Sequence, residues 1–348
     1  MNTENEKKTG AAKLLGRILS FLGVTLCCLV LILLGVIWVL EKGPSPTATG
    51  MFTRSVRETS AIRWVSRIFL SEEELEKYKS VSSPQEEGKA VNTSLIHMAE
   101  ASEIPDEDDP GFELVDVSEG TCKGKLLIVK DPKRVILGTS DNFGVEAGWQ
   151  LTEMVEKYGA IAGINAGGFN DEGGHGNGST PQGLVVDDGE VTWGASHIGG
   201  FHVVGLDYDG ILHVGFMTVK QAQEIGIRWG VSFETHDGLA SALIVNGEVQ
   251  TQNLGGGVNP RTAIGQREDG ALLLLVLDGR SISTLGATMQ DICDIMLKYG
   301  AVNAGNLDGG SSSVMVYGGE IINNCASVVG PRRIPTAFLL MEEGDVDG

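Results

Sequence analysis

Two glycine-rich segments carry the groups best suited to hold an anionic ligand. The first is NAGGFND, from Asn165 to Asp171, and the second is NLDGGSSS, from Asn306 to Ser313. Glycines adopt positive φ and let backbone amides approach a ligand closely, and successive amides in such a turn form an anion-binding nest. With the serine hydroxyls as further donors, these segments suit a phosphate or a cluster of sugar hydroxyls. The alternative for either segment alone is a tight turn that binds nothing.

Two carboxylates and one arginine stand beside these segments. Asp308 is the carboxylate of the second segment, where the first has Gly167, and Asp278 ends the apolar run LLLLVLDG. Arg261 begins a predicted strand in NPRTAIG, and an arginine fork suits a phosphodiester. The alternatives are a strand-end acid that caps a turn and an ordinary surface charge.

Similar elements surround the two segments. EMVEKYGA precedes the first and DIMLKYGA the second, and in both the apolar residues follow the spacing of one helix face. Gly159 and Gly300 then stand where a left-handed residue ends a helix. We therefore predict two duplicated halves whose glycine segments face each other.

Paired β-prone runs separated by turn residues are the commonest pattern after Phe112. They outnumber the possible βαβ crossovers, so we predict an α+β domain with mixed or mostly antiparallel sheets. The predicted hairpins span residues 125–141, 183–193, 201–215, 242–252, 261–279 and 311–322, and a short helix is predicted over 218–226.

An uncharged apolar run from Ile18 to Leu40 has the length of a bilayer-spanning helix. Four cations precede it, at Lys7, Lys8, Lys13 and Arg17, which predicts a cytoplasmic amino terminus. A cleaved signal peptide is the alternative, but its apolar core is shorter. We predict a cytoplasmic tail at 1–17, a single-pass signal anchor at 18–40 contacting the lipid bilayer, an extracytoplasmic stalk at 41–111 and one domain at 112–342. A capping box at Ser71 predicts a helix in the stalk, running to about Tyr78.

Charge and cysteine usage exclude other classes. The formal net charge of −20 excludes a general nucleic-acid binder, which needs basic patches. The five cysteines show no spacing typical of zinc, so no cofactor is predicted, although a divalent cation stays open. His175 and His197 lie in glycine-rich loops as proton donors or as solvated side chains.

Seven stretches, in this order, resemble the phosphodiester glycosidase family: NAGGF, GLVVDDGEV, FHVVGLDYDGILHVG, NPRTAIG, LVLDGR, GATMQDICDIMLKYGA and NLDGGSSS. The resemblance covers roughly residues 112–342 and is specific as a combination. It implies hydrolysis of a sugar-1-phosphodiester to a free sugar and a phosphomonoester. The anchor and the few cysteines differ from the animal enzymes and favour a bacterial surface polysaccharide or glycoconjugate as substrate.

The resemblance also implies which residues line the site. We expect Asp308 to act at the anomeric carbon, Asp278 to be the second carboxylate and Arg261 to hold the phosphodiester. The predicted substrate-binding residues are Asn165, Gly167, Gly168, Phe169, Asn306, Gly309, Gly310 and Ser311.

Two other functions stay open from the residues. A metal-dependent phosphodiesterase would use Asp278, Asp308 and Asn306 as oxygen ligands. A non-catalytic surface module would bind anionic glycan through the same loops.

Overall fold

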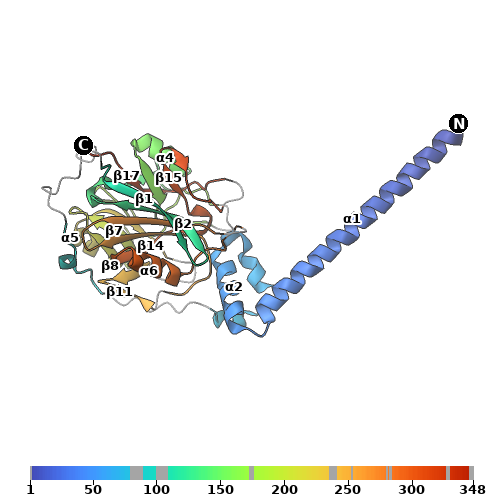
Figure 1. The fold of residues 1–348 in the computed structure, drawn as a ribbon, viewed down its shortest axis with the longest axis horizontal. Coiled ribbons are helices and arrows are strands. Elements are labelled where there is room, and N and C mark those ends of the chain that lie inside the picture. Colours follow the sequence, from blue (N-terminus) through green and yellow to red (C-terminus); the bar gives the residue numbers. More distant parts are fainter. Residues whose placement is uncertain are drawn as a thin grey trace.

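The computed structural model describes residues 2–78, 89–98, 109–171, 176–234, 241–251, 254–279, 281, 284–326 and 330–344. A long amino-terminal helix, α1, projects from a domain in which helices cover layered sheets (Figure 1). The helices are α1 (Asn2–Lys42), α2 (Pro46–Glu58), α3 (Glu72–Glu76), α4 (Leu151–Tyr158), α5 (Val219–Ile225) and α6 (Met289–Lys298), with 3-10 turns η1 (Ser60–Arg67), η2 (Thr93–Leu95), η3 (Pro132–Arg134) and η6 (Gly310–Ser312).

The described strands form three sheets, in which neighbouring strands pair antiparallel. The large sheet has the order β1 (Phe112–Glu119), β2 (Cys122–Val129), β13 (Leu272–Leu277), β12 (Arg261–Arg267), β14 (Ala301–Asn306), β10 (Ala242–Val245) and β11 (Glu248–Val249). The β4 sheet has the order β16 (Glu320–Ile321), β15 (Met315–Tyr317), β4 (Ala162–Asn165), β17 (Thr336–Leu340) and β3 (Val135–Thr139). The β9 sheet has the order β6 (Glu190–Trp193), β5 (Val185–Asp187), β9 (Ile227–Ser232), β7 (Gly200–Asp207) and β8 (Leu212–Thr218). The predicted α+β class is confirmed.

The main core lies between the three sheets. Leu272, Leu274 and Val276 of β13 join it, while Leu273 and the other alternate residues of the same strand face a second core under α6. Because side chains alternate along a strand, the unbroken apolar run of β13 is explained by burial on both faces. Helices α4 and α5 cover the β4 sheet and the β9 sheet in the same way.

Most of the predicted hairpins are confirmed, and one is wrong. Runs 183–193, 201–215, 242–252, 261–279 and 311–322 contain the hairpins β5–β6, β7–β8, β10–β11, β12–β13 and β15–β16, and the predicted helix at 218–226 is α5. Run 125–141 is not a hairpin: β2 pairs with β1 and β13, whereas β3 pairs with β17 in another sheet. Pro132 begins η3 between them, and this turn carries the chain to the β4 sheet.

The internal duplication is not confirmed, although its local parts recur. Gly159 and Gly300 both have positive φ, 65° and 88°, at the ends of α4 and α6, and each is followed by a strand. The strand surroundings differ, because β4 lies between β15 and β17 while β14 lies between β12 and β10.

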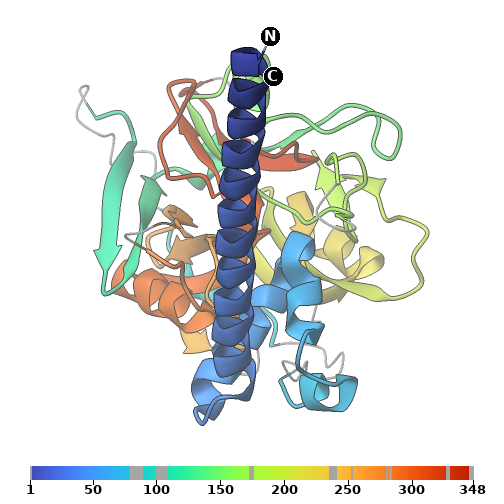
Figure 2. The same ribbon diagram turned by 90° about the vertical axis from the view of Figure 1, so that its right-hand side faces the viewer.

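The amino-terminal part consists of α1 and a short stalk packed on the domain. Residues Lys13–Lys42 of α1 are long and apolar enough to cross a membrane by length and composition, and an 18-residue stretch within them has a mean hydropathy of 2.8. A signal sequence would share these properties. In the stalk, Ser71 and Glu74 form the predicted capping box of α3, which ends earlier than predicted, at Glu76. Figure 2 shows α2 and the stalk at the base of α1.

Candidate active site

The second glycine segment leaves the large sheet at Asn306 and crosses to the β4 sheet. The amide of Leu307 donates to Thr262 O (2.9 Å), and the amide of Asp308 donates to Ala166 O (3.0 Å). The amide of Gly310, which has φ +64°, donates to Pro260 O (2.8 Å). The two glycine segments therefore lie side by side at the carboxyl ends of β4 and β14, as predicted.

Asn165 fastens this junction through every polar atom of its side chain. Its Nδ2 donates to Asp308 O (2.6 Å), and its Oδ1 accepts from Thr262 Oγ1 (2.8 Å) and from the amide of Val314 (3.1 Å). The residue is 1 % exposed. Asn165 thus positions the loop that carries Asp308, and these contacts give it a structural task beside the predicted binding role.

The Asp308 carboxyl has the most perturbed acidity of the site. Burial raises its pKa to about 7, while the Ser312 hydroxyl, the nearby Arg332 charge and the Gly309 amide act in the opposite direction. Asp171 adds a repulsive negative charge that raises the pKa further. A carboxyl with this pKa exchanges a proton near neutral pH, which suits acid or base catalysis.

Arg332, which the sequence analysis missed, supplies positive charge beside Asp308. Its guanidinium contacts Asp171 (Nη2–Oδ1 2.7 Å), the Ser311 hydroxyl (Nη1–Oγ 3.1 Å) and Gly176 O (2.8 Å). It also lies 5.3 Å from the centre of the Phe169 ring. Nothing in the stretch PRR distinguishes it from Arg333, which pairs with Glu153 at the half-exposed surface.

Arg261 lies next to the same loop, but its guanidinium already bonds to other groups of the protein. A Cβ at Gly309 would lie 2.9 Å from Pro260 O and 3.9 Å from Arg261 Cδ, so only glycine permits this approach. The Arg261 side chain is buried, and its Nη2 contacts Glu58 Oε2 of α2 at 2.8 Å. Its Nε donates to Ala287 O (3.2 Å). Its expected role as a fork for the phosphodiester stays a prediction.

Asp278 is connected to the loop of Asp308 by the side chain of Asn323, which bonds to both. Its Oδ1 accepts from the amide of Asn324 (2.9 Å) and from Asn323 Nδ2 (3.3 Å), and Asn323 Nδ2 also contacts Ser313 O (3.3 Å). Burial raises the pKa of Asp278, against the two asparagine contacts and the Lys125 charge. The structure thus places both predicted carboxylates around one loop.

Most backbone amides that were expected to bind an anion donate instead to acceptors within the protein. The amide of Gly167 donates to Thr336 Oγ1 (3.0 Å) and that of Gly168 to Ser232 O (3.1 Å). Gly309 and Gly310 amides are likewise bonded, to Asp308 and to Pro260 O. The side chain of Asn306 differs, because its buried Oδ1 accepts no hydrogen bond from the described residues. A ligand hydroxyl could supply that donor.

The two histidines and the possible metal ligands named from the sequence complete the account of the predicted residues. His197 lies in the loop before β7 and stacks on Phe201, with the ring centres 4.6 Å apart, while His175 lies outside the described residues. Among the side chains that the structure describes, no three His, Cys, Asp or Glu residues are grouped as a metal site.

Replacing Asn165 with alanine should destabilise the domain strongly. It would leave Thr262 Oγ1, Val314 N and Asp308 O without their partner, at about 1–3 kcal/mol for each buried group left unsatisfied. Urea denaturation measures the loss, and Asn177→Ala is the control, because Asn177 is exposed and its side chain accepts from the amide of Ser179 at the surface instead of joining buried groups. Equal stability of the two variants would show that Asn165 does not hold the junction.

Asp308→Asn should stabilise the protein increasingly as pH rises. The pKa of Asp308 is raised to about 7 when folded, against roughly 3.9 when unfolded. The native state therefore binds more protons between these values, and the wild-type free energy of unfolding falls as pH rises from about 4 to 7. The Asp308→Asn variant has no carboxyl at this position, so its free energy of unfolding lacks this pH-dependent decrease. Denaturation at several pH values tests it, with the exposed Asp209→Asn as control; a pH-independent difference would contradict the assignment.

Comparison with known proteins gives consistent results. The family model for phosphodiester glycosidase matches residues 158–341. A SPbeta prophage-derived uncharacterized protein, YomE of Bacillus subtilis (strain 168), is 27 % identical over 248 residues, covering 68 % of this chain and 37 % of that protein. Bovine N-acetylglucosamine-1-phosphodiester alpha-N-acetylglucosaminidase is 33 % identical over 91 residues, covering 24 % of this chain and 17 % of the bovine protein. The chain thus spans well under half the length of both relatives.

A solved structure shares the fold. The zebrafish N-acetylglucosamine-1-phosphodiester alpha-N-acetylglucosaminidase catalytic domain, described as auto-inhibited by its pro-peptide, is similar with a TM-score of 0.55 and 19 % identity. The likeness covers 68 % of this chain and 86 % of the zebrafish chain. Since the family model covers more than half of the residues and includes both carboxylates, both arginines and the second glycine segment, the chain belongs to the phosphodiester glycosidase family.

Proposed function

We propose that this protein is a membrane-anchored hydrolase that cleaves the glycosyl C1–O bond of a sugar-1-phosphodiester outside the cytoplasm. The observation that carries the proposal is the placement of Asp308, with a pKa of about 7, beside Arg332 and Ser311 in the family's glycine segment. A carboxyl that exchanges protons near neutral pH and an adjacent guanidinium are what hydrolysis of an anionic glycoside needs.

In this mechanism the arginine and the loop hold the departing phosphate. Arg332 and the Ser311 hydroxyl are 3.1 Å apart and can share the phosphoryl oxygens of the substrate. The C1–O bond breaks, its electron pair leaves with the phosphate, and water ultimately supplies the new oxygen at C1. The products are the free sugar and a phosphomonoester. A phosphate is a good leaving group, so stabilising the departing anion matters more than strong acid assistance.

Asp308 acts at the anomeric carbon, as nucleophile or as base for the attacking water. Asp278, held by Asn323 and Asn324 at the other end of the loop, is the second carboxylate. The buried Oδ1 of Asn306 is suited to accept from a sugar hydroxyl. Both stereochemical outcomes are compatible with these roles.

The amino-terminal helix supports a membrane location. Cations precede its apolar segment and Trp38 lies near its other end, which favours a cytoplasmic amino terminus and a signal anchor. The domain would then face the exterior, where a phosphodiester-containing surface polysaccharide or glycoconjugate is the proposed substrate. The names of the bovine and zebrafish proteins point to the same class of bond.

Hydrolysis of UDP-N-acetylglucosamine in ¹⁸O water tests the bond that is cleaved. We expect the label in the sugar, because water attacks carbon, with or without a chelator. Asp308→Asn should lower the rate by at least roughly 100-fold, whereas the exposed Asp209→Asn should not. Label in the phosphate would show cleavage at phosphorus, and glycan binding without any labelled product would show a binding module.

The neighbouring arginines provide a matched test of the phosphate site. Arg332→Gln should cost roughly 2–5 kcal/mol of transition-state binding, typical of a buried charged contact. Arg333→Gln, which removes the same charge one residue away at the surface, should leave kcat/KM nearly unchanged. Circular dichroism checks folding, and equal kcat/KM for the two variants would exclude Arg332 from the site.

A further inference from the structure

Asp171, the last residue of the first glycine segment, holds the guanidinium of Arg332. The two groups meet edge to edge, with Asp171 Oδ1 2.7 Å from Arg332 Nη2 and Asp171 Oδ2 3.2 Å from Nη1. Asp171 Oδ1 also accepts from the amide of Gly176 (2.7 Å). The side chains of Arg332 and Asp171 are 12 % and 21 % exposed. Such a two-point contact between planar charged groups is the strong form of an arginine–carboxylate pair.

The contact of Arg332 with Ser311 is the one that a ligand can replace most easily. Arg332 Nη2 also donates to Gly176 O (2.8 Å), and the Phe169 ring centre lies 5.3 Å from the guanidinium carbon. Nη1 donates to the Ser311 hydroxyl (3.1 Å), a neutral acceptor in the second glycine segment. A phosphoryl oxygen can take the place of this hydroxyl, which can then donate to the phosphoryl group. Asp171 keeps its contacts, so the ligand meets an arginine whose charge is already balanced.

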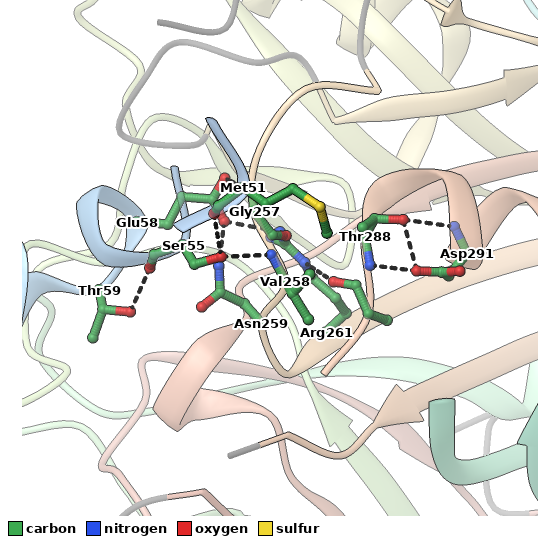
Figure 3. Close-up of polar contacts among 11 residues, drawn as sticks. Met51, Ser55, Glu58, Thr59, Gly257, Val258, Asn259, Arg261, Thr288 and Asp291 are labelled. Carbon is green, nitrogen blue, oxygen red and sulfur yellow. Dashed lines mark hydrogen bonds and ion pairs between the residues drawn. The ribbon is translucent and has the colours of Figure 1, made fainter. Parts of the chain in front are cut away.

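The surroundings add negative charge to this pair. Asp308 has a pKa of about 7 and is therefore partly ionised at neutral pH. Arg261, the other arginine beside the loop, is paired with Glu58 (Nη2–Oε2 2.8 Å), as Figure 3 shows. A ligand at Ser311 thus meets two arginines that have carboxylate partners and one further carboxyl group. Each negative charge on the ligand is repelled by Asp171 and Asp308.

This charge balance separates the substrate class from the product class of the proposed reaction. A phosphodiester carries one negative charge, whereas a phosphomonoester, with a second pKa of about 6, carries between about 1.5 and 2 near neutral pH. An arginine without a carboxylate partner attracts the dianion more strongly than the monoanion, so it would retain the product. A fixed negative charge beside the arginine opposes the dianion more than the monoanion, which is discrimination by an added repulsion.

We infer that Asp171 is a specificity-determining residue that makes the site prefer a monoanionic phosphodiester to a dianionic phosphomonoester. It acts through Arg332, which it positions and whose charge it balances. The meaning of this preference for substrate and product rests on the proposed function, whereas the difference in binding between the two classes of ester does not.

The test measures the binding of two matched esters by the full-length chain in detergent. Methyl phosphate is a monoester and dimethyl phosphate is a diester, and neither contains a glycosyl bond. At about pH 7.5 and constant ionic strength, ³¹P NMR titration gives the dissociation constant of each. In Asp171→Asn, dimethyl phosphate should bind roughly threefold more tightly than in wild type and methyl phosphate roughly tenfold, because the lost repulsion acts on about twice the charge. The affinity ratio therefore shifts about threefold toward the monoester.

Two further variants separate the charge of Asp171 from its geometry. Asp171→Glu keeps the negative charge and should keep the wild-type ratio of the two affinities. Glu153→Gln removes the carboxylate that pairs with the neighbouring Arg333 at the surface (3.0 Å), and it should also leave the ratio unchanged. A merely structural role of Asp171 would weaken the binding of both esters equally in Asp171→Asn, and the ratio would not move.

Several outcomes would overturn the inference. These are an unchanged ratio in folded Asp171→Asn, an equal shift in Glu153→Gln, and no binding of either ester by any variant. Wild type alone also decides, whether or not the asparagine variant folds, because tighter binding of methyl phosphate than of dimethyl phosphate by wild type would contradict the preference.

Turnover of a sugar-1-phosphodiester is measured separately. Inhibition by methyl phosphate should be roughly tenfold stronger in Asp171→Asn than in wild type. Absence of turnover in wild type, with the shift in the binding ratio intact, would reject the proposed activity and leave the role of Asp171 standing. Turnover in wild type with an unchanged ratio in Asp171→Asn would reject the inference alone.

Discussion

The structure around the candidate site depends on the hydrogen bonds of one buried amide. Asn165 ends β4 in one sheet, and its side chain holds Thr262 of the large sheet, Val314 before β15 and the backbone of Asp308. Buried polar groups need partners, and here each of the three partners belongs to a different segment. The two glycine segments stay together because this amide satisfies all of them at once.

Close packing around the loop sets its electrostatics. The chain has a net charge of −20, yet the loop gathers carboxyl groups in a partly buried place, where desolvation disfavours their charged forms. The Arg332 charge opposes this effect at Asp308, and asparagine contacts oppose it at Asp278. Arg332 also forms an ion pair with Asp171. The site therefore combines one acid near neutral pKa with a fixed positive charge, a pairing common at functional sites.

The stalk connects the amino-terminal helix to this arrangement. Only three residues separate α1 from α2, and α2 attaches to the domain through Ser55 and Glu58. A buried ion pair contributes more to specificity of placement than to net stability in some proteins. Here the pair of Glu58 and Arg261 links the position of the stalk to the surroundings of the loop that carries Asp308.

The sequence predicted those local structures that depend on contacts between residues close together in the chain. The Asp-Gly and Asn-Gly turns gave their hairpins, Ser71 its capping box, and Gly159 and Gly300 their helix ends, because such contacts join residues a few positions apart. The predicted hairpin of β2 and β3 was wrong, because each strand pairs with strands that are distant in the sequence. Strand pairing depends on the packing of the sheets as well as on adjacency along the chain. The glycine segments were predicted to form a site because their composition is unusual and resembles the family, and the structure brings the two segments together.

Tertiary structure decided everything that depends on contacts between distant residues. Arg332 meets Ser311 and Asp171, Glu58 meets Arg261, and burial raises the pKa of Asp308. None of these has a sequence signature, because a side chain's charge partner and its desolvation depend on which surfaces pack together. The sequence by itself determined most helix and strand types, the turns and the position of the glycine segments. Only the folded packing decided that Arg332 contacts Ser311 and that Arg261 pairs with Glu58 of the stalk.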